Sequence, residues 1–311
     1  MFNLYNDLDL DRLRVIRPSK FLFLCGGGVS NPNYKASSLR DYLYRVRPTQ
    51  ARLRTELVLA EKATQLYRDT HYADLISFEE DIARIAAVVL VIAESPGALA
   101  ELGAFATNDA ISRVLRIILQ EKYASSESFI RFGPVRRIEN RDREFVGFFP
   151  WRVHRNGVLV IRSAQPHYVD IVRFIRQHLN SVPSSELYRN KTDSAAFYII
   201  YWVLYLGVAV PPSILCECLD KLIPDLGQRE ALNKVYCMRI AGWVGVTSYS
   251  GRDYYFVLHP RDPFDYSFRS GVKERDIIRR RSDATTALSK LIKAPRHVLE
   301  VANEHRTGAG K

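Results

Sequence analysis

Short runs of apolar residues alternate with amphipathic stretches through the first 180 residues of the chain. The apolar runs cover residues 21–25, 57–59 and 86–93, and residues 114–119 are apolar apart from Arg116. Uninterrupted apolar runs are typical of strands that are buried on both faces of a parallel sheet. The stretches at 37–43, 78–86, 98–106 and 168–179 instead repeat apolar residues at helical spacing. Strands that alternate with helices predict an α/β fold with a doubly wound parallel sheet and right-handed crossovers.

Two local signals mark the end of this first pattern. Asn156-Gly157 lies between apolar runs within residues 146–161, which predicts a β-hairpin. Ser181-Val182-Pro183-Ser184-Ser185 has the composition of a linker. We therefore expect one domain over residues 1–180 and a second over residues 186–311.

The pattern of the second half differs from that of the first. Helical spacing at 195–206, 214–222 and 228–240 is followed by apolar runs at 242–247 and 254–258. Three helices and a hairpin in this order predict a winged-helix-like α+β domain, whose third helix would enter a major groove. A small helical domain that ends in a hairpin without binding DNA is the alternative. The tail repeats apolar residues at helical spacing from Ile277 to Ile292, which indicates either a docking helix or an exposed arm.

The balance of charges points to an anionic partner. The chain has 45 Lys and Arg against 34 Asp and Glu, a formal net charge of +11, and its isoelectric point is about 9.5. A nucleic acid would fit this excess, and so would an ordinary basic surface in solvent. The side chains predicted to contact a nucleic acid are Arg239, Tyr249, Arg252, Arg279, Arg280 and Arg281.

Several classes of protein are disfavoured. The four cysteines have no paired spacing and the seven histidines do not cluster, so neither a disulfide framework nor a metal site is expected. The N-terminus lacks the features of a signal peptide. The most apolar run, residues 195–212, is interrupted by Gly207 and ends in Pro211-Pro212, which makes it short for a membrane span. We expect a cytoplasmic protein with free thiols and no membrane contact.

The segment from Glu94 to Glu101 carries the strongest indication of chemistry. It follows the apolar run at 86–93 and contains a Pro-Gly turn, so it stands at the carboxyl end of a predicted strand, where open α/β sheets bind ligands. Glu101 is expected in the first turn of the next helix, where the helix dipole would keep a nucleophilic carboxylate ionised. An acid placed there for stability alone is the alternative. Glu94 is expected to bond a sugar hydroxyl or assist proton transfer, or else to cap the next helix. Ser95 and Gly97 are candidate substrate contacts in the same turn.

A run of glycines provides a second candidate site. Gly26, Gly27 and Gly28 directly follow the first predicted strand, which ends at Cys25. Glycines in such a turn let backbone N–H groups approach a phosphate or sugar, although the spacing matches neither a dinucleotide fingerprint nor a Walker loop. A tight turn without a ligand is the alternative. The remaining candidates, each of which could instead be a surface or capping residue, are Glu79 for catalysis and Glu61 and Asn108 for substrate contact.

These segments, taken in order, resemble one protein family. Gly97 and Glu101-Leu102-Gly103 match the Gly-x-x-x-Glu-Leu/Met-Gly segment of nucleoside 2-deoxyribosyltransferases and their N-glycosidase relatives. Effector proteins of bacterial retrons have segments similar to Phe23-Leu24-Cys25-Gly26-Gly27, Glu94-Ser95-Pro96-Gly97, Gly133-Pro134-Val135-Arg136 and, with Ile in place of Leu, Ile76-Ser77-Phe78-Glu79. The resemblance is specific over residues 20–140 and looser beyond them. Among these effectors the chain looks most like toxins of cold-anomalous, Salmonella-type retrons.

The resemblance implies both a fold and an activity. It implies a flavodoxin-like sheet followed by a winged-helix-like nucleic-acid-binding domain. It also implies an anti-phage toxin that cleaves the N-glycosidic bond of a nucleotide such as NAD without a cofactor. Glu101 would be the nucleophile, and Glu79 or Glu94 would position the sugar or the water. Where the family commonly has a tyrosine after the first strand, this chain has Cys25-Gly26, which disfavours base exchange more than cleavage of the glycosidic bond and leaves both hydrolysis and base exchange open.

The implied partners are those of a retron. They are a reverse transcriptase and its multicopy single-stranded DNA–RNA hybrid, which would hold the toxin inactive, and the nucleotide substrate; a homo-oligomer is a further candidate. Two alternatives without catalysis stay open. One is a DNA-binding regulator whose N-terminal domain senses a nucleotide without cleaving it, and the other is a scaffold that senses a phage component.

Overall fold

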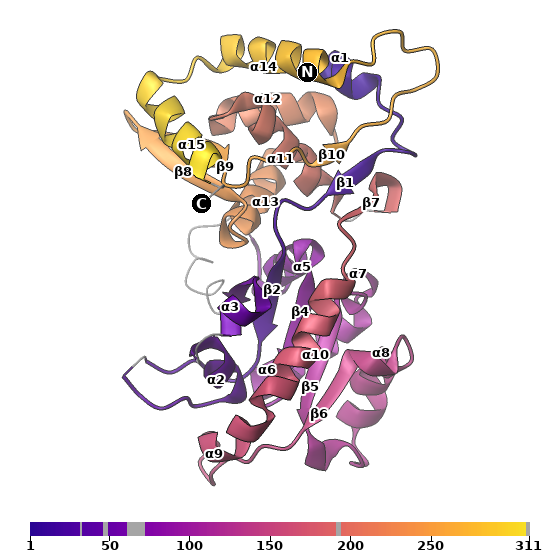
Figure 1. Cartoon of the computed structure of the whole chain (residues 1–311), viewed down its shortest axis with the longest axis vertical. Coiled ribbons are helices and arrows are strands. Elements are labelled where there is room, and N and C mark those ends of the chain that lie inside the picture. The colour runs from indigo at the N-terminus through magenta and orange to yellow at the C-terminus, as the bar shows by residue number, and fades with distance from the viewer. Residues whose placement is uncertain (32, 46–48, 61–71, 191–193, 309–311) are drawn as a thin grey trace. The chain divides into compact units, whose positions relative to one another are not determined.

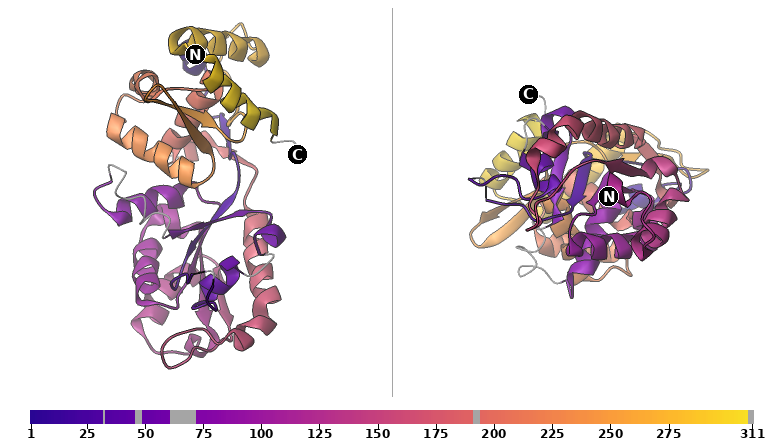
Figure 2. Two further views of the ribbon diagram at one scale, coloured as in Figure 1. Left: turned by 90° about the vertical axis from the view of Figure 1, so that its left-hand side faces the viewer. Right: turned by 90° about the horizontal axis from the view of Figure 1, so that it is seen from below.

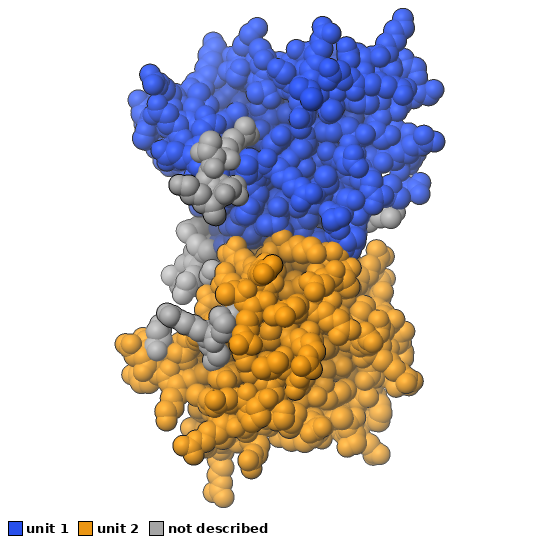
Figure 3. Space-filling model, in the orientation of Figure 1, with its two compact units in different colours: residues 1–19, 66–81, 183–311 blue, residues 20–65, 82–182 orange. Residues whose placement is uncertain are grey.

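The structure is a computed structural model that describes residues 1–31, 33–45, 49–60, 72–190 and 194–308. The chain forms two compact units (Figures 1 and 3). The sheet unit contains residues 20–65 and 82–182, and the helical unit contains residues 1–19, 66–81 and 183–311. The boundary at 182–183 falls in the segment with linker composition. The N-terminal segment and residues 66–81 belong to the helical unit. The predicted division into residues 1–180 and 186–311 places both segments in the first domain instead.

A five-stranded parallel sheet forms the centre of the sheet unit. Its strands are β2 (Phe21–Cys25), β3 (Glu56–Leu59), β4 (Val88–Ile92), β5 (Leu115–Gln120) and β6 (Val146–Phe149). They lie in the order β3-β2-β4-β5-β6, and all neighbouring pairs are parallel. Numbered along the chain, this order is 2-1-3-4-5. β2, β4 and β5 are buried along their whole length, which is why β2 and β4 are unbroken apolar runs and β5 is apolar apart from Arg116 and Gln120. The predicted α/β fold with a parallel sheet is confirmed.

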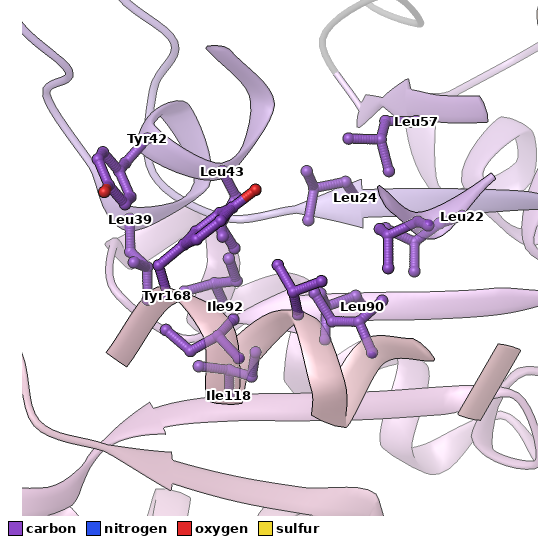
Figure 4. Close-up of a cluster of buried hydrophobic side chains, with 14 of the residues drawn as sticks. Leu22, Leu24, Leu39, Tyr42, Leu43, Leu57, Leu90, Ile92, Ile118 and Tyr168 are labelled. Carbon is purple, nitrogen blue, oxygen red and sulfur yellow. The ribbon is translucent and has the colours of Figure 1, made fainter. Parts of the chain in front are cut away.

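Helices and short turns connect these strands. The helices are α2 (Leu39–Arg45), α3 (Thr49–Leu53), α5 (Leu75–Ile85), α6 (Pro96–Thr107), α7 (Asp109–Ser112), α8 (Arg136–Glu139), α9 (Ile161–Ala164) and α10 (Tyr168–Ser181). Residues 121–123, 143–145 and 165–167 form 3-10 turns, and Arg131–Val135 forms a π-helical turn. One face of the sheet is covered by α2 and α10, which bring Leu39, Leu43 and Tyr168 against strand side chains such as Leu24 and Ile92 (Figure 4).

The hairpin predicted within residues 146–161 is wrong in part. The turn exists, because Gly157 adopts a positive φ of 82°, but only one isolated bridge, Val153 to Leu159, joins its two sides. The first apolar run, Val146–Phe149, instead extends the sheet as β6, parallel to β5. β5 is buried at all six positions, and β6 pairs with the edge of β5 that would otherwise be unpaired.

The helical unit combines a helical core with two small antiparallel sheets. Its elements are α1 (Phe2–Asn6), β1 (Arg14–Ile16), β7 (Ser185–Leu187), a 3-10 turn at 188–190, α11 (Ala195–Gly207), α12 (Pro212–Leu222), α13 (Gln228–Ile240), β8 (Val244–Tyr249), β9 (Arg252–Val257), β10 (Phe264–Asp265), α14 (Ile277–Ile292) and α15 (Arg296–Gly308). The N-terminal strand β1 pairs with β7 on one side and β10 on the other. Two later segments of the chain therefore pair with its N-terminal strand.

The predicted order of three helices and a hairpin is confirmed. α11 is buried along almost its whole length and packs against α12, α13 and α14. The hairpin β8–β9 (Figure 2) turns at Ser250 and Gly251, which both have positive φ, as a two-residue hairpin turn requires. The tail forms a docking helix rather than a free arm, because α14 packs against α11 and α1. In the part of the chain that the structure describes, no helix is long and apolar enough to cross a membrane.

Candidate functional site

The candidate site lies where β2 and β4 end side by side. β2 pairs with β4 in parallel, with Cys25 opposite Val91, so both carboxyl ends reach the same edge of the sheet. After β2 the chain crosses to β3 on one side, and it then returns to β4 on the other. Ligands of open α/β sheets bind at this kind of reversal in strand order. The triglycine turn follows β2 here, and the Glu94–Glu101 segment follows β4.

The start of α6 differs from the sequence-based expectation. The Ser95 hydroxyl accepts a hydrogen bond from the Ala98 N–H at 3.2 Å and donates to the Gly26 carbonyl at 3.3 Å. Ser95 is thus the N-cap, and the helix begins at Pro96 rather than at Ala98, since proline is favoured at the first helical position. Glu101 is therefore the sixth residue of α6. The prediction that it lies in the first turn, held ionised by the helix dipole, is wrong.

Glu101 has an unusual local environment. Its Oε2 atom is buried and has no hydrogen-bond partner among the described residues. The Cys25 side chain forms a hydrogen bond with the carboxyl group. Burial raises the pKa of Glu101 above its ordinary value, while the Arg40 guanidinium and the Cys25 bond act against that rise. The carboxylate thus has one buried oxygen left for a ligand.

Arg40 is a site residue that the sequence analysis missed. Its exposed fraction is only 1%, and its Nε donates to the Gly27 carbonyl at 2.6 Å. Its charge acts on both Glu94 and Glu101. Burial lowers the pKa of Arg40, but a guanidinium remains protonated in proteins. Nothing in the local sequence separates it from a surface arginine on a helix, since its burial depends on the triglycine turn folding over it.

Glu94 organises the two loops around it. Its Oε1 accepts hydrogen bonds from the N–H groups of Gly27 at 3.1 Å and Arg40 at 2.9 Å, and its Oε2 accepts one from Leu39 at 2.7 Å. Leu39 and Arg40 begin α2, whose first N–H groups have no partner within the helix. Glu94 therefore caps a helix that lies more than fifty residues earlier in the chain. Burial raises its pKa and the three N–H donors offset part of that rise. This geometry favours a positioning role for Glu94.

Two of the three glycines after β2 are required by close packing. A Cβ on Gly27 would lie 2.6 Å from Ser38 Cβ, and one on Gly26 would lie 3.0 Å from Arg40 Cβ. Gly28 and Gly97 have open space where a Cβ would stand. The turn is therefore folded tightly over Arg40 and against Glu94. The N–H group of Gly27 already donates a hydrogen bond to Glu94. Substrate contact by Cys25, Ser95 and these glycines stays a prediction.

The other predicted site residues lie elsewhere. The Asn108 side chain caps α7, accepting from the N–H groups of Ala110 and Ile111, and it stands at the opposite end of α6 from Glu94. Glu79 lies on α5 in the stretch that belongs to the helical unit, and its catalytic role stays a prediction. Glu61 lies outside the described residues.

The residues predicted to contact a nucleic acid fall into two groups. Arg239, Tyr249 and Arg252 are exposed, and Arg252 donates to the Ser213 hydroxyl at 3.0 Å. The tail arginines form ion pairs within the unit: Arg279 with Glu274 at 3.5 Å, Arg280 with Asp7 at 2.5 Å and Arg281 with Asp262 at 2.9 Å. Of these three, Arg280 has the least exposed side chain.

Most of α13, the helix predicted to enter a major groove, is covered. Its first-turn residues and Arg239 are exposed, but Lys234 is buried, with its Nζ atom 3.4 Å from Asp81 Oδ2 and 3.2 Å from Glu230 Oε1. Tyr72 donates to the same Asp81 carboxylate at 2.7 Å. In the described structure, only the two ends of α13 are therefore exposed enough to contact bases in a DNA groove.

Comparisons with known proteins agree with one another. Residues 36–246 match the model of a family described as STM3845 retron effector protein. A protein of Escherichia coli named "Retron Ec86 putative ribosyltransferase/DNA-binding protein" is 28% identical over 222 residues, 69% of this chain and 67% of that protein. A second, "Retron Ec73 putative ribosyltransferase/DNA-binding protein" of the same organism, is 27% identical over 146 residues. That match covers 46% of each chain. The family match includes α2 and α6, and with them Arg40, Glu94 and Glu101.

Proposed function

The chain belongs to the STM3845 retron effector family, and from that premise we propose that its sheet unit is an N-glycosidase in which Glu101 is the nucleophile. The observation that carries this proposal is the buried Oε2 atom of Glu101, which has no partner among the described residues. It stands beside the buried cation Arg40 at the edge of the sheet where ligands bind. The unit would then be a deoxyribosyltransferase-like domain, and the 2-1-3-4-5 strand order is the flavodoxin-like order.

The reaction has two steps. In the first, Glu101 Oε2 attacks the anomeric carbon of a ribosyl or deoxyribosyl group, and the bond from that carbon to the base nitrogen breaks. The base leaves with the electron pair of that bond, and an ester between the sugar and Glu101 forms. In the second, water attacks the same carbon, loses a proton and releases the sugar and the carboxylate. This is the retaining logic of carboxylate-based glycosidases.

The surrounding residues keep the nucleophile ready for attack. Arg40 and Cys25 favour the ionised form of Glu101 against the effect of burial, and only the ionised form attacks. Glu94 holds the triglycine turn and the start of α2 together, and so holds Arg40 in place. A water molecule can accept the sugar from Glu101 in the second step. The expected reaction is therefore hydrolysis of a nucleotide such as NAD.

The helical unit would bind the retron nucleic acid. Both similar proteins have DNA-binding in their names, and this chain carries a net charge of +11. We propose that a winged-helix-like arrangement of α11 to β9 binds the multicopy single-stranded DNA–RNA hybrid of a retron, together with its reverse transcriptase. Exposed Arg239 and Arg252 are candidates for phosphate contact, which would make the complex salt-sensitive.

The experiment compares metabolites of cells that express the chain with those of cells that express Glu101→Gln. Glu127→Gln, at an exposed glutamate of the same unit, is the matched control. Loss of a nucleotide and appearance of its free base with the unchanged chain and with Glu127→Gln, but not with Glu101→Gln, supports the proposal and identifies the substrate. If cells that express the Glu101→Gln protein are still poisoned, the proposed role of Glu101 is contradicted. A nucleotide that binds without loss of its base would instead favour the nucleotide-sensing regulator.

A further inference from the structure

A cavity opens in the sheet unit beside the candidate site. It has a volume of about 370 Å³ and lies where β4 and β5 end, between the start of α6 and the loops after β5 and β6. Cavities of this size are typical of small-molecule sites. Leu99 lines it, whereas Glu101, two positions further along α6, is not among its lining residues. Because two helical positions turn a side chain by about 200°, the cavity and the nucleophile occupy different sides of the helix.

The wall of the cavity suits a flat aromatic group. Leu119, Ile130 and Trp151 supply apolar surface, and Tyr123 stands beside them. Trp151 is 5% exposed, and its indole N–H is buried without a hydrogen-bond partner among the described residues. A buried indole N–H ordinarily has an acceptor. An aromatic ligand with ring nitrogens or carbonyl oxygens could provide one.

The rim of the cavity suits an anion. Lys122 is exposed and lines the cavity, with its ammonium 4.8 Å from the centre of the Tyr123 ring. Ser126 and Ser128 contribute hydroxyl groups. The one carboxylate among the lining residues is Glu94, and its two oxygens already accept three backbone N–H bonds. Lys122 and Arg131 both line the cavity, so its charged side chains are two cations against one carboxylate.

We propose that this cavity is a second binding site, distinct from the Glu101 site, for a nucleotide: an aromatic base against Trp151 and a phosphate at Lys122. Two sources share this chemistry, namely the second half of a dinucleotide substrate and a separate nucleotide. Glu94 and Ser95 line the cavity and also form part of the loop that carries the candidate site. A ligand in the cavity would therefore contact Glu94, which accepts a hydrogen bond from the Arg40 N–H.

The test measures binding of adenosine monophosphate to the full chain by calorimetry. The protein carries Glu101→Gln, so that no ligand is consumed. Val153→Trp narrows the mouth, since Val153 lines the cavity and is 40% exposed. The matched control is Val169→Trp, because Val169 is 51% exposed on α10 and does not line the cavity. Lys122→Gln removes the cation at the rim.

The proposal expects each of Val153→Trp and Lys122→Gln to weaken binding about tenfold or more, while Val169→Trp leaves it unchanged. Adenosine and ribose 5-phosphate, which each lack half of the ligand, should bind about tenfold more weakly than the monophosphate. Failure of adenosine monophosphate to bind overturns the proposal. Equal affinity for the protein with Val153→Trp and with Val169→Trp also overturns it, because the ligand would then occupy another site.

Kinetics with Glu101 intact separate the two sources of the nucleotide. If the cavity holds part of the substrate, Val153→Trp raises the KM for base release. If it holds a separate nucleotide, KM is unchanged and added adenosine monophosphate alters the rate. Both results support the site. The calorimetric test does not depend on catalysis, so failure of the proposed N-glycosidase activity and failure of this site are distinguishable.

Discussion

Glu94→Gln tests whether one side chain holds the candidate site together. The carboxylate of Glu94 accepts hydrogen bonds from the N–H groups of Gly27, Leu39 and Arg40 at 2.7–3.1 Å. Glutamine has one acceptor oxygen, so its NH2 group must face at least one of these N–H donors. The substitution removes one or two bonds to a charged acceptor and leaves the same number of donors without a protein partner.

The expected loss can be estimated from these bonds. Hydrogen bonds to charged groups contribute about 1.5–3 kcal/mol each. The substitution removes at least one such bond, so we expect local destabilisation of about 2 kcal/mol. This corresponds to a reduction of about thirtyfold in amide protection when the segment opens locally.

Hydrogen exchange followed by mass spectrometry measures this loss directly. Peptides that contain Gly27 and the first turn of α2 should exchange faster in the Glu94→Gln protein. Peptides from β5, which is buried and makes none of these bonds, should exchange as before. Glu127→Gln again serves as the control for removal of a charge. Unchanged protection at Gly27 and α2 in the Glu94→Gln protein would refute the inference that Glu94 organises the turn.

Three further predictions concern charge at the site and in the helical unit. Cys25→Ala removes a bond that lowers the pKa of Glu101, so the acidic limb of the pH–rate profile for base release should move to higher pH; an unmoved limb would refute this role of the thiol. Arg40→Met should move the same limb further and Arg40→Lys less, because lysine keeps the charge. Lys234→Met removes an ammonium that lies 3.4 Å from the buried Asp81 carboxylate and should destabilise the helical unit by more than about 1 kcal/mol in urea unfolding; a smaller loss would contradict this, being the size expected of an exposed pair.

The parallel sheet could be predicted from the sequence because burial on both faces leaves a simple pattern. β2 and β4 are unbroken apolar runs, β5 is apolar apart from Arg116 and Gln120, and α10 shows its buried stripe at helical spacing. The strands β1, β7 and β10 left no such pattern. Each has two or three residues, too few to show an alternation, and β1 pairs with segments more than 160 residues away.

The candidate site was predictable in its residues but not in its arrangement. The strand-turn-helix segment from Glu94 to Glu101 and the triglycine turn were visible, since both follow apolar runs. The positions of their side chains were not. Because Ser95 caps the helix and Pro96 begins it, α6 starts two residues earlier than predicted. Glu101 therefore lies beyond the first turn. The burial of Arg40 depends on long-range folding of the glycine turn, and local sequence does not record it.

Base release by the purified chain tests directly whether Glu101 is the nucleophile. Candidate nucleotides, NAD among them, are incubated with the unchanged protein, with Glu101→Gln and with Glu127→Gln, and the products are separated by chromatography. We predict a free base from at least one nucleotide with the unchanged protein and with Glu127→Gln, and none with Glu101→Gln. Equal release of base by the Glu101→Gln protein would contradict the assignment of Glu101 as the nucleophile.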